Sequence, residues 1–251
     1  VPPVDVTGYA IDRTATYETS RRFRAERTVE QLGVLFGDGW YPTFKQRTAR
    51  NIRRSVVHDR QVAAGGRFNA SFGWEFAEWF AGSEQPQPAT PGFHRQPSHT
   101  FVAREHAAVR NGVGVLDMSL MAKLSVQGPA AAAVLGRLSA NDIDREVGRL
   151  VYTQWLDAAG GIAADVTVCR VADDRFLVVA GDIIHRRIEP MIRRALRPGE
   201  VAVVTDVTSA TTLLSVQGPA SRELLGRLTD ADLGNAAFPY LTAQHLSLIH
   251  I

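Results

Sequence analysis

The chain has 251 residues, enough for one large domain or two ordinary ones. Hydrophobic residues make up 45% and charged residues 22%, which is typical of globular proteins, and the formal net charge of +2 argues against electrostatic binding of nucleic acid. The single cysteine, Cys169, excludes an internal disulfide and a CxxC metal site, and no stretch resembles a membrane span or a signal peptide.

The first part of the chain, residues 1–81, combines a helix with Arg-rich and aromatic stretches. Apolar side chains at near-helical spacing predict a helix within residues 19–36. The Arg-rich run 45–55 lacks interleaved aromatic residues, so it favours a solvated or interdomain face over a nucleic-acid site. The stretch FGWEFAEWF at 72–80 contains five aromatic side chains, which need to be buried against another surface. Four prolines within twelve residues then predict an extended linker at 82–99: Pro86, Pro88, Pro91 and Pro97.

Residues 100–251 alternate between strand-like and helix-like stretches, which indicates an α+β architecture. The pattern predicts helices at 101–111, 129–138, 182–196 and 219–228, and strands at 115–127, 150–156, 161–171, 175–180, 200–207 and 212–217.

The heptapeptide LSVQGPA occurs twice, at 124–130 and 214–220. Its Leu-Ser-Val alternation suits a strand that enters a core, Gly permits a sharp turn, and Pro suits the first turn of a helix. A phosphate-binding loop is the alternative, but the further glycines and the Lys or Ser/Thr donors of a P-loop are missing. We interpret the repeat as a duplicated strand–Gly-Pro–helix scaffold and expect the functional site between its copies.

One acidic residue between the copies is unusual for a strand. The alternation of residues 162–171 predicts that Ala163, Asp165, Thr167, Cys169 and Val171 share one face. Asp is disfavoured in strands, so Asp165 marks either a face open to water or a pocket for a cationic or N–H-rich ligand. Tyr152 and Trp155 on the preceding strand either flank such a pocket or pack in the core, and core packing is favoured for Trp155. The seven histidines show no metal-ligand spacing, so we propose no metal.

These residues resemble a known family. The run GVGVLDMSLMAKLSVQGPAA, followed by LVYTQWLDAAGGIAADVTVCRV and RFLVVAG, resembles the folate-binding domain of the glycine cleavage T-protein (aminomethyltransferase) family. The run VTDVTSATTLLSVQGPASRELLGRL resembles the branch fused to FAD-dependent dimethylglycine and sarcosine dehydrogenases, and RTVEQLGVLF through GWEFAEWF resembles the segment after their FAD domain. The resemblance covers residues 1–244. It implies an internal fragment of a longer enzyme: a central segment at 1–81, the linker at 82–99, and a truncated T-protein-like domain with mixed or antiparallel sheets at 100–251.

The resemblance also implies a chemistry. An upstream flavin domain that holds FAD oxidises an N-methyl amine, and tetrahydrofolate bound to this part of the chain captures the one-carbon unit. Asp165 matches the family's catalytic carboxylate, although Ala164 replaces the Asp that precedes it there. Tyr152, Met121 and Thr167 match folate-contacting positions, and Cys169 stands where the family has a pocket Tyr.

The implied partners are folate, the N-methyl amine and the flavin domain, and neither nucleic acid nor a membrane is expected. The implied compartment is the cytoplasm, or the mitochondrial matrix in a eukaryote. Two other functions stay open: a T-protein-like methyltransferase for O- or S-methyl substrates, and a folate-binding module without catalysis. The family's later folate contacts lie beyond residue 244, and the tail 245–251 does not continue its pattern, so we expect this chain alone to be inactive and to bind folate weakly or not at all.

Overall fold

The computed structural model of the protein describes residues 14–36, 45–90 and 92–247. Parts of the predicted 1–81 segment, Pro91 of the linker and the end of the 245–251 tail lie outside the described residues. The described residues divide into two compact units, which we call the hairpin unit (up to Leu120, with Leu214–Ser221) and the sheet unit (Met121–Leu213, with the residues from Arg222 onward). This division follows contacts within the fold. The predicted limits at 1–81, 82–99 and 100–251 come from the proline-rich stretch and from the resemblance, and they stay a prediction.

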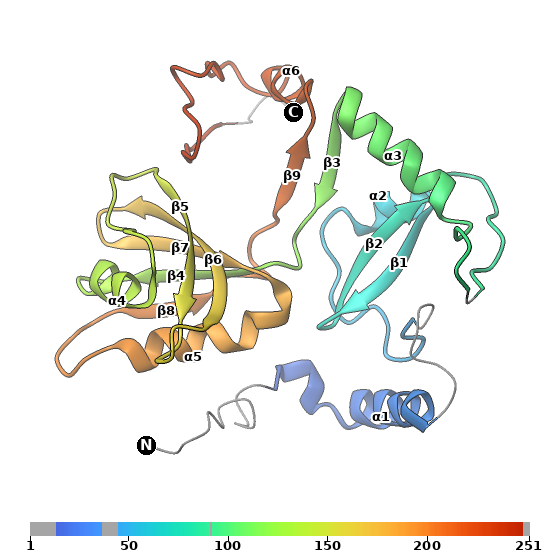
Figure 1. Cartoon of the computed structure of the whole chain (residues 1–251), viewed down its shortest axis with the longest axis horizontal. Helices are drawn as coiled ribbons and strands as arrows, with labels where there is room; N and C mark the ends of the chain where they lie inside the picture. Colours follow the sequence, from blue (N-terminus) through green and yellow to red (C-terminus); the bar gives the residue numbers. More distant parts are fainter. Residues whose placement is uncertain (1–13, 37–44, 91, 248–251) are drawn as a thin grey trace. The chain divides into compact units, whose positions relative to one another are not determined.

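The hairpin unit carries two antiparallel pairs of strands, β1 with β2 and β3 with β9 (Figure 1). Its elements are η3 (Thr16–Thr19), α1 (Arg21–Phe36), α2 (His58–Ala63), β1 (Gly66–Ser71), β2 (Trp74–Phe80), α3 (His99–Asn111), β3 (Gly114–Asp117) and β9 (Leu214–Gln217). The helix predicted within 19–36 is confirmed as α1, and the one at 101–111 is confirmed as α3, whose C-cap residue is Gly112.

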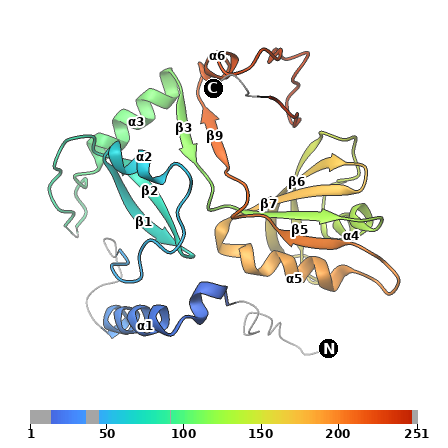
Figure 2. The same ribbon diagram turned by 180° about the vertical axis from the view of Figure 1, so that it is seen from behind.

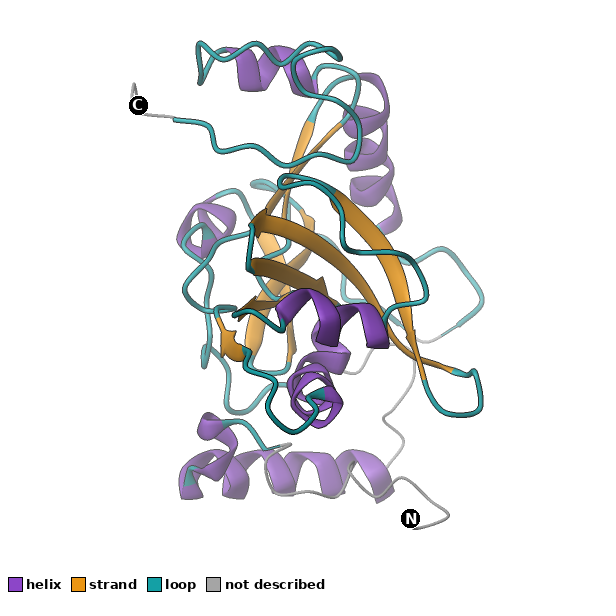
Figure 3. Ribbon diagram, turned by 90° about the vertical axis from the view of Figure 1, so that its left-hand side faces the viewer, coloured by secondary structure: helices purple, strands orange, loops and turns teal. Residues whose placement is uncertain are grey.

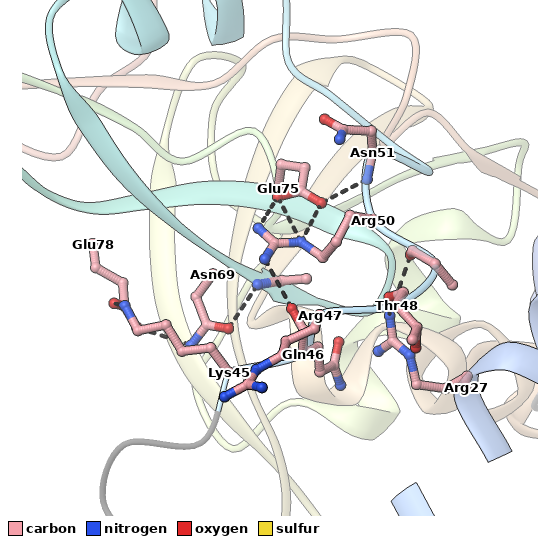
Figure 4. A network of polar contacts seen from close by, with 12 residues as sticks. Arg27, Lys45, Gln46, Arg47, Thr48, Arg50, Asn51, Asn69, Glu75 and Glu78 are labelled. Atoms are coloured by element: carbon pink, nitrogen blue, oxygen red, sulfur yellow. Dashed lines mark hydrogen bonds and ion pairs between the residues drawn. The ribbon is translucent and has the colours of Figure 1, made fainter. Parts of the chain in front are cut away.

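Hydrogen bonds tie the Arg-rich segment to β2 (Figure 4). Glu75 is 4% exposed and accepts hydrogen bonds from the Arg50 guanidinium, with Nε–Oε1 at 2.8 Å, and from the Asn51 backbone N–H at 2.7 Å. Burial alone would raise the pKa of Glu75, but these hydrogen bonds hold it below its ordinary value. Arg27 of α1 donates to the Thr48 carbonyl at 2.7 Å. Much of the basic run is therefore engaged inside this unit rather than open to solvent.

The sheet unit is built on a five-stranded antiparallel sheet in the order β5-β6-β7-β4-β8 (Figure 2). Its elements are β4 (Ala122–Gln127), α4 (Ala131–Leu138), β5 (Leu150–Leu156), β6 (Ile162–Ala172), β7 (Arg175–Ala180), η4 (Asp182–Ile184), α5 (His185–Ala195) and β8 (Val203–Asp206), and α6 (Ser221–Gly226) follows β9. Helices and antiparallel sheets in one chain confirm the α+β prediction (Figure 3).

One face of this sheet forms the core with α4 and α5. Alternate residues of each strand point to the same side, so Leu124, Val166 and Val178 all face the helices. Leu135 of α4 and Ile188 of α5 pack onto them, and all five side chains are at most 1% exposed. Full burial of each such side chain contributes about 1.5–3 kcal/mol, which makes this face the main source of the unit's stability. The opposite face is left for other roles.

The two LSVQGPA copies fold as predicted into a strand, a glycine turn and a helix. Gly128 has φ +136° and Gly218 has φ +114°, a region that side chains rarely adopt. A Cβ at Gly218 would also lie 2.4 Å from the Gly112 carbonyl oxygen. The expected place of the prolines is wrong, because α4 and α6 begin two residues after Pro129 and Pro219. Each proline therefore stands in the turn and not in the first helical turn.

Burial separates the two copies. Leu124 in β4 is fully buried, whereas Leu214 at the same place in β9 is 43% exposed. β4 lies inside the five-stranded sheet between β7 and β8, whereas among the described residues β9 pairs with β3 alone. The burial of each copy therefore depends on the elements that pack against it and not on the repeated sequence itself.

The continuous strand predicted at 115–127 is wrong. Residues 114–117 form β3 and residues 122–127 form β4, in two different sheets. Between them the Asp117 side chain accepts a hydrogen bond from the Ser119 N–H at 3.1 Å, an Asx turn that ends the strand. Among the described residues, no helix has the length and apolar character needed to span a membrane.

Candidate functional site

The predicted site residues lie on the face of the five-stranded sheet that is opposite α4 and α5. In β6, Ala164 and Val166 are buried in the core and Asp165 between them is exposed. The alternation predicted from the sequence is therefore correct. The core packing of the neighbouring residues fixes the backbone, so the Asp165 carboxylate is presented to solvent from a rigid strand.

Tyr152 and Asp165 form a hydrogen-bonded pair on this face. Tyr152 lies opposite Thr167 in the β5–β6 register, and Asp165 occupies the diagonal position two residues away. The Tyr152 hydroxyl donates to Asp165 Oδ2 at 2.6 Å, although the tyrosine is 53% exposed. This hydrogen bond, with burial and the nearby negative charge, raises the pKa of Tyr152. The pair presents an aromatic ring and a carboxylate side by side.

The other predicted contacts differ in how accessible they are. Thr167 is half-buried beside the pair, and Met121 is half-buried directly before β4. Cys169 is only 4% exposed, and burial raises the pKa of its thiol. Of these three predicted contacts, Thr167 and Met121 therefore keep some accessible surface, and Cys169 has almost none.

Trp155 does not belong to this face. It is fully buried in the core, and its indole N–H donates to the Ser139 hydroxyl at 3.1 Å. The core-packing interpretation of Trp155 is therefore confirmed, whereas Tyr152 is open to solvent.

Lys123 is a residue of this face that the sequence reasoning missed. It is paired with Val179, which is paired in turn with Thr167, so the three residues lie in one row across the sheet. Lys123 is 1% exposed, and its ammonium donates to the Met121 carbonyl at 2.9 Å. A lysine between apolar residues of a strand is as unusual as Asp165, so the same argument would have found it.

A polar pair with a buried histidine lies at the other edge of the sheet. The His185 ring nitrogen Nε2 lies 2.8 Å from Asp206 Oδ2 and 3.2 Å from the Thr208 hydroxyl, and His185 is 7% exposed. Burial would raise the pKa of Asp206, but hydrogen bonds from His185 and Thr208 hold it well below its ordinary value. The pair connects the start of α5 to the end of β8.

A polar cleft of about 620 Å³ adjoins the Tyr152 side of the pair. Its polar lining includes Asn141, Asp142, Arg145, Glu146, Arg149 and Tyr152. Most of these residues belong to the loop before β5, where no periodic pattern marks them in the sequence. In the described parts of the chain, no three His, Cys, Asp or Glu side chains come together as a set of metal ligands.

The fold and the face together define the class of domain: an α+β unit with helices on one face of an antiparallel sheet and a Tyr–Asp pair on the other. The family model described as "GCVT N-terminal domain" matches residues 57–251, and the chain belongs to this family. It therefore carries a domain of the aminomethyltransferase T-protein type.

Relatives in sequence include oxidoreductases as well as aminomethyltransferases. The chain is 35% identical over 240 residues to the 4-methylaminobutanoate oxidase (formaldehyde-forming) of Paenarthrobacter nicotinovorans, a match that covers 95% of this chain and 29% of the oxidase. It is 28% identical to the mitochondrial sarcosine dehydrogenase of Mus musculus, over 81% of this chain and 26% of that enzyme. The chain thus spans less than a third of the length of these two relatives.

A solved structure has the same fold. The glycine cleavage system aminomethyltransferase T from Bartonella henselae superposes with a TM-score of 0.61 and 22% sequence identity, over 76% of this chain and 47% of that chain. The domain is therefore of the aminomethyltransferase type in fold and is related in sequence to sarcosine-dehydrogenase-type enzymes.

Proposed function

We propose that this chain binds tetrahydrofolate and passes a one-carbon unit to it, as part of a flavin-dependent N-methyl amine dehydrogenase of the dimethylglycine or sarcosine type. The observation that carries the proposal is the exposed Tyr152–Asp165 pair, joined by a 2.6 Å hydrogen bond on the open face of the sheet. The relatives support the reaction type, since one is named for a methylamino substrate and for forming formaldehyde, and another for sarcosine.

The residues of the face fit a folate ring in part. The Asp165 carboxylate is an exposed acceptor for N–H groups, and the Tyr152 ring offers a surface on which a flat heterocycle can stack. Met121 and Thr167 add half-buried surface from two other places on the sheet. Cys169 adds almost none, because it is buried.

Tetrahydrofolate, when bound, supplies the nitrogen atoms that take up the one-carbon unit. Asp165 provides a fixed negative charge beside a cationic group, which lowers the energy of a state in which positive charge develops there. Because the Tyr152 hydroxyl is bonded to Oδ2, we assign Asp165 Oδ1 as the oxygen that accepts a proton. Tyr152 orients the carboxylate through this hydrogen bond.

The proposal includes FAD in a flavin domain of the same protein, which would oxidise the amine. It also places the reaction in a reducing compartment, the cytoplasm or the mitochondrial matrix. A chain with a single cysteine fits such a compartment, and the Mus musculus relative is named as mitochondrial.

The test is Asp165→Ala in the protein at its full natural length. We expect flavin reduction by the amine at the unchanged rate and a fall of about 100-fold in the rate of methylene-tetrahydrofolate formation, the low end of what a proton-transfer group contributes. Formaldehyde should appear in its place. Stopped-flow absorbance follows the flavin, and chromatography separates the two one-carbon products.

Asp174→Ala is the matched control, because Asp174 is also an exposed aspartate of the sheet unit but lies in the turn between β6 and β7. It should leave both half-reactions unchanged. Unchanged product ratios in Asp165→Ala would exclude the proposed role, and a parallel loss of flavin reduction would show that the substitution disturbs the whole protein.

A further inference from the structure

Gln154 lies on the same face of the sheet as the Tyr152–Asp165 pair. It follows Tyr152 by two residues in β5, so alternation places both side chains on the side opposite the helices, whereas Trp155 faces the core. In the β5–β6 register, Gln154 is the direct partner of Asp165. The Cβ atoms of direct partners lie about 4.5–5.5 Å apart, so the half-buried Gln154 side chain is a neighbour of the Asp165 carboxylate.

The backbone of β5 is held in place on both sides of this face. The Asn141 side-chain amide donates to the Tyr152 carbonyl at 2.8 Å, and the Ala140 N–H donates to the Gln154 carbonyl at 2.9 Å. Between them, the Thr153 side chain is fully buried. What the backbone does not determine is the direction of the tyrosine O–H bond. A phenol hydroxyl turns about its C–O bond, and Tyr152 is 53% exposed, so water competes for this donor.

The hydrogen bonds of the Tyr152 hydroxyl determine its direction. The hydroxyl donates its proton to Asp165 Oδ2 at 2.6 Å. This hydrogen bond is the largest cause that raises the pKa of Tyr152, whereas a side-chain hydrogen bond with Gln154 lowers the same pKa. A hydrogen bond that lowers the pKa of a phenol favours the phenolate, so the Gln154 amide N–H is the donor and the phenol oxygen is the acceptor. An oxygen that accepts from Gln154 on one side presents its own proton on the other, toward Asp165.

We propose that Gln154 is a positioning residue for the one-carbon transfer: its amide holds the Tyr152 hydroxyl in the orientation that donates to Asp165 Oδ2 and leaves Oδ1 to accept the proton. The inference rests on the proposed function and adds to it the residue that orients the tyrosine. Without the amide, the exposed hydroxyl turns toward water in part of the molecules. Neither carboxylate oxygen is then reserved for proton transfer.

The experiment observes the phenol in the protein at its full natural length. A 3-fluorotyrosine at position 152 gives one fluorine NMR signal, and its pH titration yields the pKa of the phenol. Gln154→Met removes the amide donor at nearly the same side-chain length, so this pKa should rise relative to the equally labelled wild-type protein. Gln154→Glu should raise it further, because a carboxylate adds a negative charge. The other charged groups around the phenol stay constant in these proteins: Asp165 on β6, and Asp142, Arg145, Glu146 and Arg149 in the cleft.

A product assay tests the role of Gln154 in the reaction. Gln154→Met should leave flavin reduction by the amine unchanged and lower the rate of methylene-tetrahydrofolate formation about five-fold, the effect of one ordinary hydrogen bond. Formaldehyde should rise in its place. Gln127→Met is the matched control, because Gln127 is an exposed glutamine of the same sheet that pairs with β7 and β8 and not with β5. It should change neither the phenol pKa nor the products.

The outcomes separate this inference from the proposed function. An unchanged or lower phenol pKa in Gln154→Met would overturn the inference, because the amide would then not donate to the tyrosine. A raised pKa with unchanged products would also overturn the positioning role, while a changed product ratio in Asp165→Ala would still support the proposed function. If Asp165→Ala leaves the products unchanged, the proposed function fails and the positioning role fails with it.

Discussion

The repeated heptapeptide allows a stability experiment in which local sequence is held constant. Leu124→Ala and Leu214→Ala change the same residue within the same seven-residue context, so strand propensity and turn chemistry are equal in both. Only the surroundings differ, because Leu124 is fully buried and Leu214 is 43% exposed.

The expected losses follow from this difference. Replacing a fully buried Leu removes its transfer free energy and leaves a cavity, so Leu124→Ala should destabilise the sheet unit by about 3 kcal/mol. Replacing Leu214 leaves no enclosed cavity, because the side chain is only partly buried. The expected loss in the free energy of unfolding is about 1 kcal/mol. The difference of about 2 kcal/mol corresponds to roughly 30-fold in an opening equilibrium.

Denaturant-dependent hydrogen exchange, read by mass spectrometry on peptides that cover 121–130 and 212–221, measures each strand separately. Each variant is compared with the wild-type peptide of the same region. Equal losses of protection at the two sites would refute the reasoning, because they would show that the local sequence and not the tertiary cover determines the stability of each copy.

Two further predictions concern the pKa values of Asp206 and Tyr152. The pKa of Asp206 is held below its ordinary value in the folded protein, so its contribution to stability is present above about pH 4 and is lost as the pH falls through the folded pKa. Asp206→Asn should therefore lower the free energy of unfolding at pH 7. In urea unfolding, the difference in this free energy between the variant and wild type should shrink below about pH 4. A difference that does not change with pH would contradict the role of the His185–Asp206 pair. Asp165→Asn should lower the pKa of Tyr152. In the wild-type protein, loss of the tyrosine proton breaks the hydrogen bond to the Asp165 carboxylate and places two negative charges together, and the substitution would remove both penalties. NMR titration of labelled tyrosine compares the variant with wild type.

The sequence predicted the strands of the sheet unit well because their signals are local. The period of two in residues 161–171 placed Ala164 and Asp165 on opposite faces, and the structure has them so. The hydrogen bond between Tyr152 and Asp165 was not predicted, because it depends on the register of β5 against β6. Register is determined by the packing of both strands on the core and not by either strand alone.

Other features depended on contacts between distant residues. The break between β3 and β4 follows from an Asx turn at Asp117 and from two different partner strands, β9 and β7. His185 and Asp206 are 21 residues apart and meet only because α5 packs beside β8. The polar cleft beside Tyr152 also requires Leu241, which lies about ninety residues further along the chain. The periodicity within one segment does not show which distant segments it will contact.

The segments around the cleft also cover a vulnerable part of the sheet. β5 is an edge strand of the sheet. The Leu150 N–H donates a hydrogen bond to the Leu241 carbonyl, and the Ala140 N–H donates one to the Gln154 carbonyl, each at 2.9 Å. Uncovered outer strands are templates for pairing with another molecule. The loop before β5 and the stretch near Leu241 therefore protect the protein from self-association, and substitutions that loosen them put solubility at risk.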